Sequence, residues 1–475
     1  MSAESLPYAF ARDHRVVVAG IADGHALLEV QETTRAESLA EARRHLGRPI
    51  RARVVDAESF AKRLESTYSS AGAAKEYRDA LEADPSLEDL LQEIPPTQDL
   101  LERDDQAPVI RMVNALLSQA LRDGASDVHL EAFERRSGVR FRRDGVLFDV
   151  LEPPRALHAA LVSRIKIMAQ LDIAEKRLPQ DGRIGLDVGG RSVDVRVSTL
   201  PTGHGERVVL RLLEKDAARL DLATLGMDVD TLATFAELVN QPHGLVLVTG
   251  PTGSGKTTTL YSALRRIDTA RRNVMTVEDP IEYDLEGIGQ TQVNARIDMT
   301  FARALRAILR QDPDVVMVGE IRDRETAETA VQASLTGHLV LATLHTNDAA
   351  SAVTRLGDMG VEPFLIASSL LGVLAQRLVR CLCPACAPDE PMRDPLASPV
   401  GCGACHLSGY RGRVGVYELM RVDAELRALI HDRAAEHDLR SRATARGLRS
   451  MRLDGERWVN TRRTSMQELM RATIA

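Results

Sequence analysis

Several things are scarce in this chain, and each shortage narrows what the protein can be. Aromatic residues make up 3% of the 475 residues, which leaves little stacking surface for single-stranded nucleic acid. The longest uncharged apolar stretch, 363–375, has thirteen residues and is shorter than the roughly twenty that a membrane-spanning helix needs. The N-terminus offers neither the basic region nor the apolar segment that directs export. We therefore expect a cytoplasmic protein.

Net positive charge is also lacking. The chain carries 61 Lys+Arg against 68 Asp+Glu, a net charge of −7. Residues 71–107 hold eleven acidic and three basic side chains, a balance of −8, so the rest of the chain sums to +1. A nucleic-acid binder would need a basic face, and none is indicated. We interpret the acidic segment as a solvated, partly helical linker; an acidic docking site for a partner is the alternative.

Lysine and cysteine are rare and unevenly placed. Only six lysines accompany fifty-five arginines, and Lys256 is the single lysine of 216–475. A position that keeps an ammonium in such a chain suggests a role that arginine cannot fill. All five cysteines lie within 25 residues, 381–405, and no export signal precedes them. Metal binding is therefore a better interpretation than disulfides.

The length and the pattern of apolar residues predict an α/β protein of several domains. In 108–219, strands of alternating polarity are joined by hairpin turns, which indicates an α+β domain. From about residue 220, apolar strands alternate with helices, which indicates a parallel sheet covered on both faces. The predicted regions are 1–68, a small α/β module; 69–107, the acidic linker; 108–219; 220–380, the sheet with a phosphate site; 381–412, a cysteine insertion; and 413–475, a helical region.

A phosphate-binding loop follows the first of the apolar strands. The segment GPTGSGKTT fits the pattern G-x-x-x-x-G-K-[ST], between an apolar strand and a helix. Its glycines allow the backbone to wrap around phosphate, Lys256 reaches the β and γ phosphates, and Thr257 can ligate Mg²⁺. A simple glycine turn is a poor alternative in this context. The predicted nucleotide-binding residues are Gly250, Pro251, Thr252, Gly253, Ser254, Gly255, Lys256, Thr257 and Thr258.

Carboxylates lie at the ends of two further strands, where ligands of open α/β sheets bind. The first strand ends at Glu278 and Asp279, with Glu282 close behind. The second ends at Gly319 and Glu320, with glycine where a Walker B element has the aspartate that ligates Mg²⁺. Glu320 suits a general base that orients water on the γ phosphate. Either carboxylate group alone could also be a helix cap, and this is the better interpretation for Asp279, which precedes a proline.

Basic side chains surround these strands in the sequence. Arg303, Arg306 and Arg310 form one stripe of a predicted helix, which suggests a phosphate or subunit contact, although a solvated face is the better interpretation for Arg303. His338 and His345 lie at opposite ends of the strand HLVLATLH. In a parallel sheet, His345 would lie on the same side as the other catalytic candidates.

Four of the five cysteines form two C-x-x-C pairs. Cys383 with Cys386 and Cys402 with Cys405 are separated by fifteen residues, a spacing typical of zinc sites. Four thiolates would close a tetrahedral Zn²⁺ site with no open position, so a structural role is predicted. Cys381 is left outside the pairs.

In order along the chain, GPTGSGKTTTLY, TVEDPIEYDLEGIGQTQVN, LRQDPDVVMVGEIRDRETA and TGHLVLATLHTNDAASAVTRL resemble the motifs of the ATPases that drive type II secretion and type IV pili. Upstream, ASDVHLE, AEKRLPQDGRI and DVRVSTLPTGHGERVVLRLL resemble the second N-terminal domain of that superfamily. The resemblance covers 108–475. It implies a RecA-like P-loop ATPase domain preceded by an α+β domain, with a small zinc-binding insertion and a helical C-terminal tail.

The family resemblance also implies roles for individual residues. Members are hexameric rings in which the preceding domain closes over the nucleotide and donates arginines, here Arg196 and Arg211, joined by Arg306, Arg310, Arg322 and Arg355. Independently of the family, the alternation of RSVDVRVS places Arg196 on the polar face of its strand. The catalytic candidates are Lys256, Glu282, Glu320, His345, Arg196, Arg211, Arg306 and Arg310.

The resemblance implies an ATPase that uses ATP and Mg²⁺ and carries structural Zn²⁺. We expect a homohexamer, peripheral at the cytoplasmic face of the inner membrane, that powers pseudopilus assembly in type II secretion. The short N-terminal module resembles the secretion branch and is expected to bind the cytoplasmic domain of an inner-membrane platform protein. No nucleic-acid partner is expected. Pilus assembly or DNA uptake is the nearer alternative, and a nucleic-acid motor or zinc-dependent nucleic-acid-binding module is the more distant one.

Overall fold

The computed structural model describes 107–188, 191–214 and 221–474, most of 14–56 except 23 and 32, and the single positions 6, 10, 11, 60 and 87. Of the acidic linker expected at 69–107, only residues 87 and 107 are among the described residues. The chain divides into two compact units, Met1–Lys215 and Asp216–Ala475, which are described separately.

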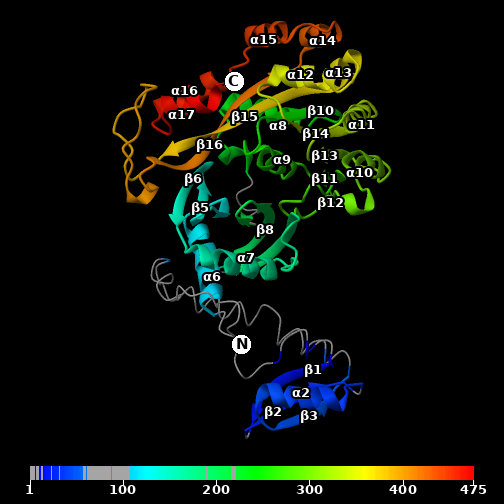
Figure 1. Ribbon diagram of the computed structural model, residues 1–475. Helices are drawn as coiled ribbons and strands as arrows, with labels where there is room; N and C mark the ends of the chain where they lie inside the picture. Colours follow the sequence, from blue (N-terminus) through cyan, green and yellow to red (C-terminus); the bar gives the residue numbers. More distant parts are fainter. Residues whose placement is uncertain are drawn as a thin grey trace. The chain divides into compact units, whose positions relative to one another are not determined.

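In the described part of the N-terminal module, helix α2 packs on a three-stranded sheet (Figure 1). Its strand order is β1-β2-β3, with β1 antiparallel and β3 parallel to β2. Leu46 of the helix packs with Val16, Val18 and Leu28 of the strands because alternate strand residues face the helix. The elements are β1 (Val16–Ala22), β2 (His25–Val30), α2 (Ala36–Leu46) and β3 (Ile50–Val54).

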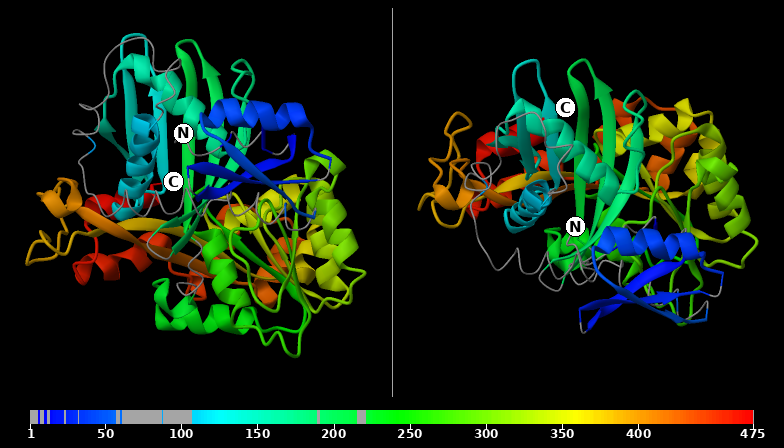
Figure 2. Two further views of the ribbon diagram at one scale, coloured as in Figure 1. Left: turned by 90° about the horizontal axis from the view of Figure 1, so that it is seen from below. Right: turned by 60° about the horizontal axis from the view of Figure 1, so that its bottom comes forward.

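The first unit also contains a six-stranded antiparallel sheet with the order β6-β5-β4-β9-β8-β7. Two helices cover one of its faces, α6 and α7, as the views in Figure 2 show. Val195 and Val197 of β8 face these helices and are fully buried, which leaves the other face of the sheet to polar residues. The elements are α6 (Ala107–Arg122), β4 (Asp127–Ala132), β5 (Ser137–Arg143), β6 (Val146–Leu151), α7 (Arg155–Met168), β7 (Gln180–Val188), β8 (Arg191–Thr202) and β9 (Gly205–Glu214).

The second unit is built on a seven-stranded sheet with the order β12-β11-β13-β14-β10-β15-β16. Neighbouring strands are parallel from β12 to β15, and only the last pair is antiparallel. The expected parallel sheet is thus confirmed for its apolar strands. The strands are β10 (Gly244–Thr249), β11 (Val274–Glu278), β12 (Gly289–Gln292), β13 (Val315–Val318), β14 (Leu339–Leu344), β15 (Leu370–Leu382) and β16 (Tyr410–Arg421).

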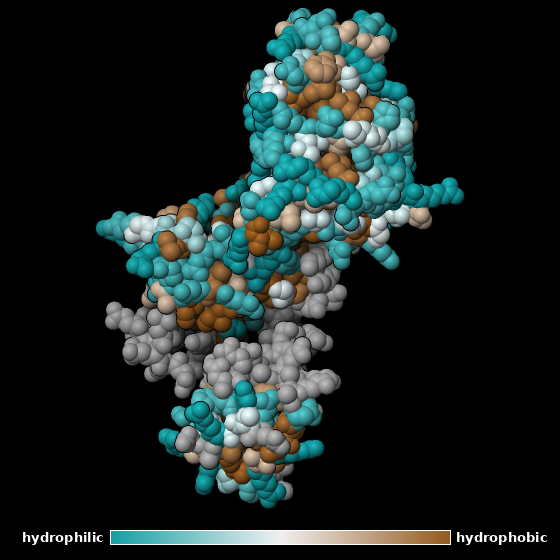
Figure 3. Space-filling view, turned by 90° about the vertical axis from the view of Figure 1, so that its right-hand side faces the viewer, coloured by the Kyte–Doolittle hydropathy of each residue, from teal (hydrophilic) through white to brown (hydrophobic). Residues whose placement is uncertain are grey.

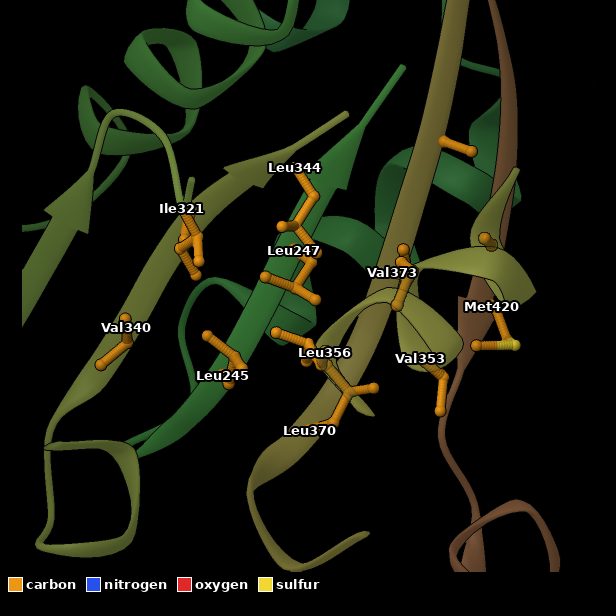
Figure 4. Packing of buried hydrophobic residues seen from close by; sticks show 14 of the residues in the cluster. Leu245, Leu247, Ile321, Val340, Leu344, Val353, Leu356, Leu370, Val373 and Met420 are labelled. Carbon is orange, nitrogen blue, oxygen red and sulfur yellow. The ribbon is translucent and has the colours of Figure 1, made fainter. Parts of the chain in front are cut away.

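Helices cover both faces of this sheet, because its central strands are apolar on both sides. Leu245 and Leu247 of β10 lie on one side with Val340 and Leu356 (Figure 4), whereas Val246 and Val248 enter the core on the other side. The first face packs against α10 to α13, and the second against α8 and α9. These helices are α8 (Val229–Leu238), α9 (Lys256–Leu264), α10 (Phe301–Ile308), α11 (Arg324–Leu335), α12 (Ala349–Asp358) and α13 (Pro363–Ser369), and short 3₁₀ turns occur at Leu222–Thr224, Ala295–Ile297 and Gly403–Cys405.

The C-terminal part differs from the expected helical region 413–475. Its first nine residues belong to β16, which forms a long hairpin with β15, and the cysteine insertion is the loop of that hairpin. Helices begin only at Ala424. The apolar stretch 363–375 contains α13 and the start of β15. The C-terminal helices are α14 (Ala424–His431), α15 (Glu436–Ala445), α16 (Met451–Asn460) and α17 (Met466–Thr473).

Neither the surface nor the helices indicate a membrane-spanning segment among the described residues. On the face in Figure 3, hydrophobic areas alternate with hydrophilic ones. Across the described part of the chain, every helix is too short or too polar to cross a membrane.

Candidate active site

The P-loop joins the end of β10 to the start of α9, as the sequence predicts. Gly250, Gly253 and Gly255 have φ angles of +148°, +79° and +88°, values that favour glycine. Space also requires glycine at Gly250, since a Cβ there would lie 2.4 Å from a backbone oxygen of β15. The loop therefore packs closely against β15 and leads into the N-terminus of α9, where backbone N–H groups can bind anions.

Lys256 is buried inside this loop, with 8% of its surface exposed. Its Nζ donates to the carbonyl oxygens of Gly250 at 2.8 Å and Pro251 at 3.2 Å. Burial lowers the pKa of Lys256 to about 8, and the nearby Glu320 carboxylate opposes that shift. The single lysine of the C-terminal unit is thus held where the pattern predicts a phosphate ligand.

The loop has features that fit a nucleotide. The Ser254 hydroxyl oxygen is buried and has no hydrogen-bond partner within the described structure. An unpaired buried hydroxyl is costly, and a phosphate oxygen would satisfy it. Thr257, the expected Mg²⁺ ligand, lies in the first turn of α9 and is exposed. The loop residues Pro251 and Thr252 are exposed as well. The remaining loop residue, Thr258, is half-buried.

Glu320 and His345 come together beside the P-loop. His345 Nε2 lies 2.9 Å from Glu320 Oε1, and Arg322 Nε donates to Glu320 Oε2 at 2.8 Å. Desolvation, aided by the charges of Lys256 and Arg322, lowers the pKa of His345 although Glu320 opposes this. A neutral His345 can donate its Nε2–H to the carboxylate and fix its orientation. The expectation that His345 lies on the catalytic side is supported by this geometry.

The other carboxylates differ in their surroundings. Glu278 is buried and accepts hydrogen bonds from Tyr261, from Thr276, and from Gln290 at 3.0 Å, so it belongs to the core of the domain. Asp279 is partly exposed and lies 3.9 Å from Arg322. Glu282 is half-buried, and its backbone N–H donates to the Tyr261 hydroxyl at 3.1 Å.

The glycine that replaces the Walker B aspartate has a steric reason. A Cβ at Gly319 would lie 3.2 Å from the Val277 carbonyl oxygen and 3.4 Å from the Cα atom of Glu278. The Gly319 N–H donates to that same carbonyl at 2.8 Å. The close approach of β11 and β13 thus leaves little room for a side chain, and Glu320 is the first carboxylate after the strand.

The predicted arginines of the second unit are exposed. Arg303 pairs with Asp298 at 2.8 Å, and Arg306 pairs with Glu325. Arg310 Nη1 donates to the Arg306 carbonyl oxygen at 2.8 Å. Arg355 is exposed in the last turn of α12. Among these predicted arginines, Arg322 contacts Glu320.

In the first unit, three arginines lie in one row across the sheet. Arg183, Arg196 and Arg211 are direct neighbours on β7, β8 and β9, and Arg211 is opposite Asp127 on β4. Directly opposed residues share a face, here the one not covered by helices. Arg211 Nε donates to the buried Asp127 Oδ1 at 2.9 Å. The alternation predicted for β8 is confirmed, since its valines are buried on the opposite face.

The four paired cysteines form one compact cluster. Their sulfur atoms all lie within 4.8 Å of one another, with 4.0 Å between Cys383 and Cys402 and 3.8 Å between Cys386 and Cys405. Four thiolates around Zn²⁺ at about 2.3 Å would be separated by about 3.8 Å. Burial alone would raise the pKa of the Cys405 thiol. The backbone N–H groups of Cys402 and Gly409 donate to its sulfur and outweigh that effect, so the pKa is lowered to about 6. This donor set fits zinc.

Two buried polar contacts of the site were not predicted from the sequence. Gln376 of β15 contacts both the P-loop and α9. Thr249, just before the P-loop, lies 2.8 Å from Thr346 between their hydroxyl oxygens, which joins the loop to the segment after β14. The sequence signal for Gln376 is an amide that directly follows the apolar run of β15.

Comparisons with known proteins identify the family. The family model described as "Type II/IV secretion system protein" matches residues 102–471, and a model of an N-terminal domain of GSPII protein E matches residues 5–68. The Pseudomonas aeruginosa "Type II secretion system protein HxcR" is 61% identical over 98% of this chain and 99% of its own length. The Vibrio cholerae "Type II secretion system ATPase E" is 51% identical over 99% of this chain and 97% of its own length.

Solved structures agree with the fold. The pilus retraction motor PilT with bound ADP is 28% identical, with a TM-score of 0.52 over 75% of this chain and 95% of that chain. The Legionella pneumophila ATPase DotB, at 21% identity and a TM-score of 0.58 over 75% of this chain and 93% of that chain, supports the fold alone. The chain therefore belongs to the type II/IV secretion system protein family and is an ATP hydrolase of its type II secretion branch.

Proposed function

We propose that the P-loop site binds ATP with Mg²⁺ and hydrolyses it, and that Glu320 is the general base. The observation that supports this most strongly is the convergence of Lys256, Glu320 and His345, three residues from separate segments, on one end of the sheet. Lys256 would leave the loop carbonyls and contact the β and γ phosphates. Glu320, held by His345 and Arg322, would accept the proton of the attacking water.

The cofactors in this proposal are Mg²⁺ and Zn²⁺. Thr257 would hold Mg²⁺, which supplies charge neutralisation at the phosphates when bound. Cys383, Cys386, Cys402 and Cys405 would hold Zn²⁺, which supplies cross-linking of the loop between β15 and β16. No open ligand position remains in a four-thiolate site, so this role is structural.

We further propose that the protein works as a homohexamer at the cytoplasmic face of the inner membrane and powers pseudopilus assembly in type II secretion. The names of the relatives support the secretion machinery rather than a nucleic-acid motor or a pilus system. The N-terminal module would bind the cytoplasmic domain of an inner-membrane platform protein, which would make the membrane association peripheral. Arg196 and Arg211 would complete the site by contacting phosphate from the preceding domain.

The replacement of Glu320 by Gln tests the assignment of the site. An amide cannot accept the proton of water, so phosphate release should fall about 10²-fold to 10⁴-fold. ATP affinity should stay within about threefold of the wild type, because Glu320 would act on the transition state and not on the bound ground state. Binding and phosphate release would be measured on the same preparation. Loss of ATP affinity with unchanged release per bound ATP would contradict the role.

A further inference from the structure

Strand β15 carries a buried amide directly against the P-loop. Gln376 has 1% of its surface exposed. Its Nε2 donates to the Ser254 carbonyl oxygen at 2.7 Å, and its Oε1 accepts from the Thr259 hydroxyl at 2.8 Å. One side chain therefore joins the loop to the helix that follows it.

The P-loop also packs closely on the same residue. A Cβ at Gly250 would lie 2.4 Å from the Gln376 carbonyl oxygen, and a Cβ at Gly255 would lie 3.3 Å from Gln376 Nε2. The glycines at both ends of the loop thus face one residue of β15. The loop is therefore in close contact with this residue at both of its ends.

The chemistry of this position calls for an amide. Neighbouring Leu374 and Ala375 are fully buried, so a polar side chain here is costly unless its donor and acceptor are both satisfied. An amide offers both at once, whereas an ionised carboxylate has no donor and an apolar side chain has neither. The contacts to Ser254 and Thr259 supply the matching groups.

We propose that Gln376 is a positioning residue for nucleotide binding. By holding the Ser254 carbonyl and α9 together, it keeps the N–H groups of the loop directed at the phosphates. The inference rests on the proposed function of the P-loop, and it assigns to the hairpin strand β15 a part in that site. Gln376 acts through the loop and does not itself contact the phosphates.

The test measures the Kd of ADP with Mg²⁺ by calorimetry on the full chain, from about pH 6 to about pH 9. Gln376→Leu removes both hydrogen bonds and should weaken binding about tenfold at every pH. Gln376→Glu should bind close to the wild type at low pH, where the introduced carboxyl is protonated and can donate to Ser254. As pH rises and this carboxyl ionises, the ratio of the variant Kd to the wild-type Kd should increase to about tenfold or more.

Two further variants separate the outcomes. Val379→Ala truncates a buried side chain on the opposite face of β15 and should lower the Tm while leaving the ADP Kd within about twofold. Lys256→Ala should lose ADP binding. Wild-type ADP affinity in both Gln376 variants at every pH, with binding lost in Lys256→Ala, would overturn the positioning role and leave the proposed function standing. Unchanged binding in Lys256→Ala would instead contradict the proposed function.

Discussion

At the scale of single residues, the proposed nucleotide binding depends most on Lys256. It is buried, it donates to two carbonyl groups of its own loop, and its pKa is about 8. The loop is therefore held together by the same ammonium that would contact phosphate.

This lowered pKa predicts a pH dependence of nucleotide affinity. Phosphate binds the protonated ammonium, whereas burial favours the neutral amine, so the free protein loses the proton as pH rises through about 8. Binding above that pH must take up a proton, and the Kd of ADP should increase by up to about tenfold per pH unit. Calorimetry in buffers of different ionisation enthalpy would measure both the affinity and the proton uptake.

Lys256→Arg serves as the matched control for this prediction. A guanidinium stays charged throughout this range, so whatever affinity remains should not vary with proton uptake at this position. A wild-type Kd that stays constant between about pH 7 and about pH 9.5 would contradict the proposed role of the Lys256 proton.

The sequence could predict those residues that belong to local patterns. The P-loop and the carboxylate after an apolar strand are recognisable within a few residues, and the position of His345 follows from a parallel sheet. Gln376 could not be predicted, because its partners are 117 and 122 residues away in the sequence. The sequence also did not show that Glu278 is a core residue. Its three hydrogen-bond partners come from α9, β11 and β12, and the packing of these elements brings them together.

At the scale of elements, the apolar strands β10, β11, β13 and β14 could be predicted, whereas β12, β15 and β16 were not. The missed strands are short or carry charged residues, and β15 follows α13 without a glycine or proline between them. The pairing of β15 with β16 also spans the cysteine loop, a non-local contact that periodicity does not show. The hairpin matters because it places Gln376 beside the P-loop and the cysteines at its far end.

The cysteine loop of this hairpin also contacts the C-terminal helices. The Met466 N–H donates to the Met392 carbonyl oxygen at 2.8 Å, and Gln467 Nε2 donates to the Ser398 hydroxyl at 2.9 Å. Both loop residues lie between the two cysteine pairs. The start of α17 is therefore held by a segment whose own fold would depend on metal.

The zinc prediction belongs to this element. The purified protein should contain about one Zn²⁺ per chain, and Cys383→Ser should reduce metal content, lower the Tm and speed amide hydrogen exchange at the start of α17. These effects follow because metal binding contributes its free energy to the folding of the loop. Elemental analysis and exchange mass spectrometry would measure them.

Cys381→Ser is the control, because Cys381 is buried in the same hairpin but lies outside the cluster of four sulfur atoms. It should keep the metal and leave exchange in α17 unchanged. Fresh, reduced wild-type protein with well below one zinc per chain would argue against the site.

At the scale of the whole molecule, the proposed mechanism involves both units of the chain. The row of arginines with Asp127 lies in the first unit, and the P-loop with Glu320 lies in the second. Family resemblance predicted Arg196 and Arg211 as phosphate contacts, and their register on adjacent strands places them on one polar face. No local pattern could have predicted the row, because strand register is set by pairing between distant segments.

The proposed assembly into rings also concerns the whole molecule. Arginines supplied by a mobile element are worth about 10³-fold to 10⁵-fold in turnover in other P-loop enzymes, with little effect on ground-state binding. Arg196→Ala should therefore bind ATP nearly as tightly as the wild type and release phosphate far more slowly. If rings are the active form, turnover per chain should also depend on protein concentration.

The most direct test of the proposed mechanism is phosphate release per chain by the full-length protein across a range of protein concentrations, with the native mass determined at each one. The wild type should show a rate per chain that rises as hexamers form, and Arg196→Ala should form the same hexamers with a rate at least about 10³-fold lower. A monomer that hydrolyses ATP at a constant rate per chain, or an Arg196→Ala hexamer with wild-type turnover, would contradict it.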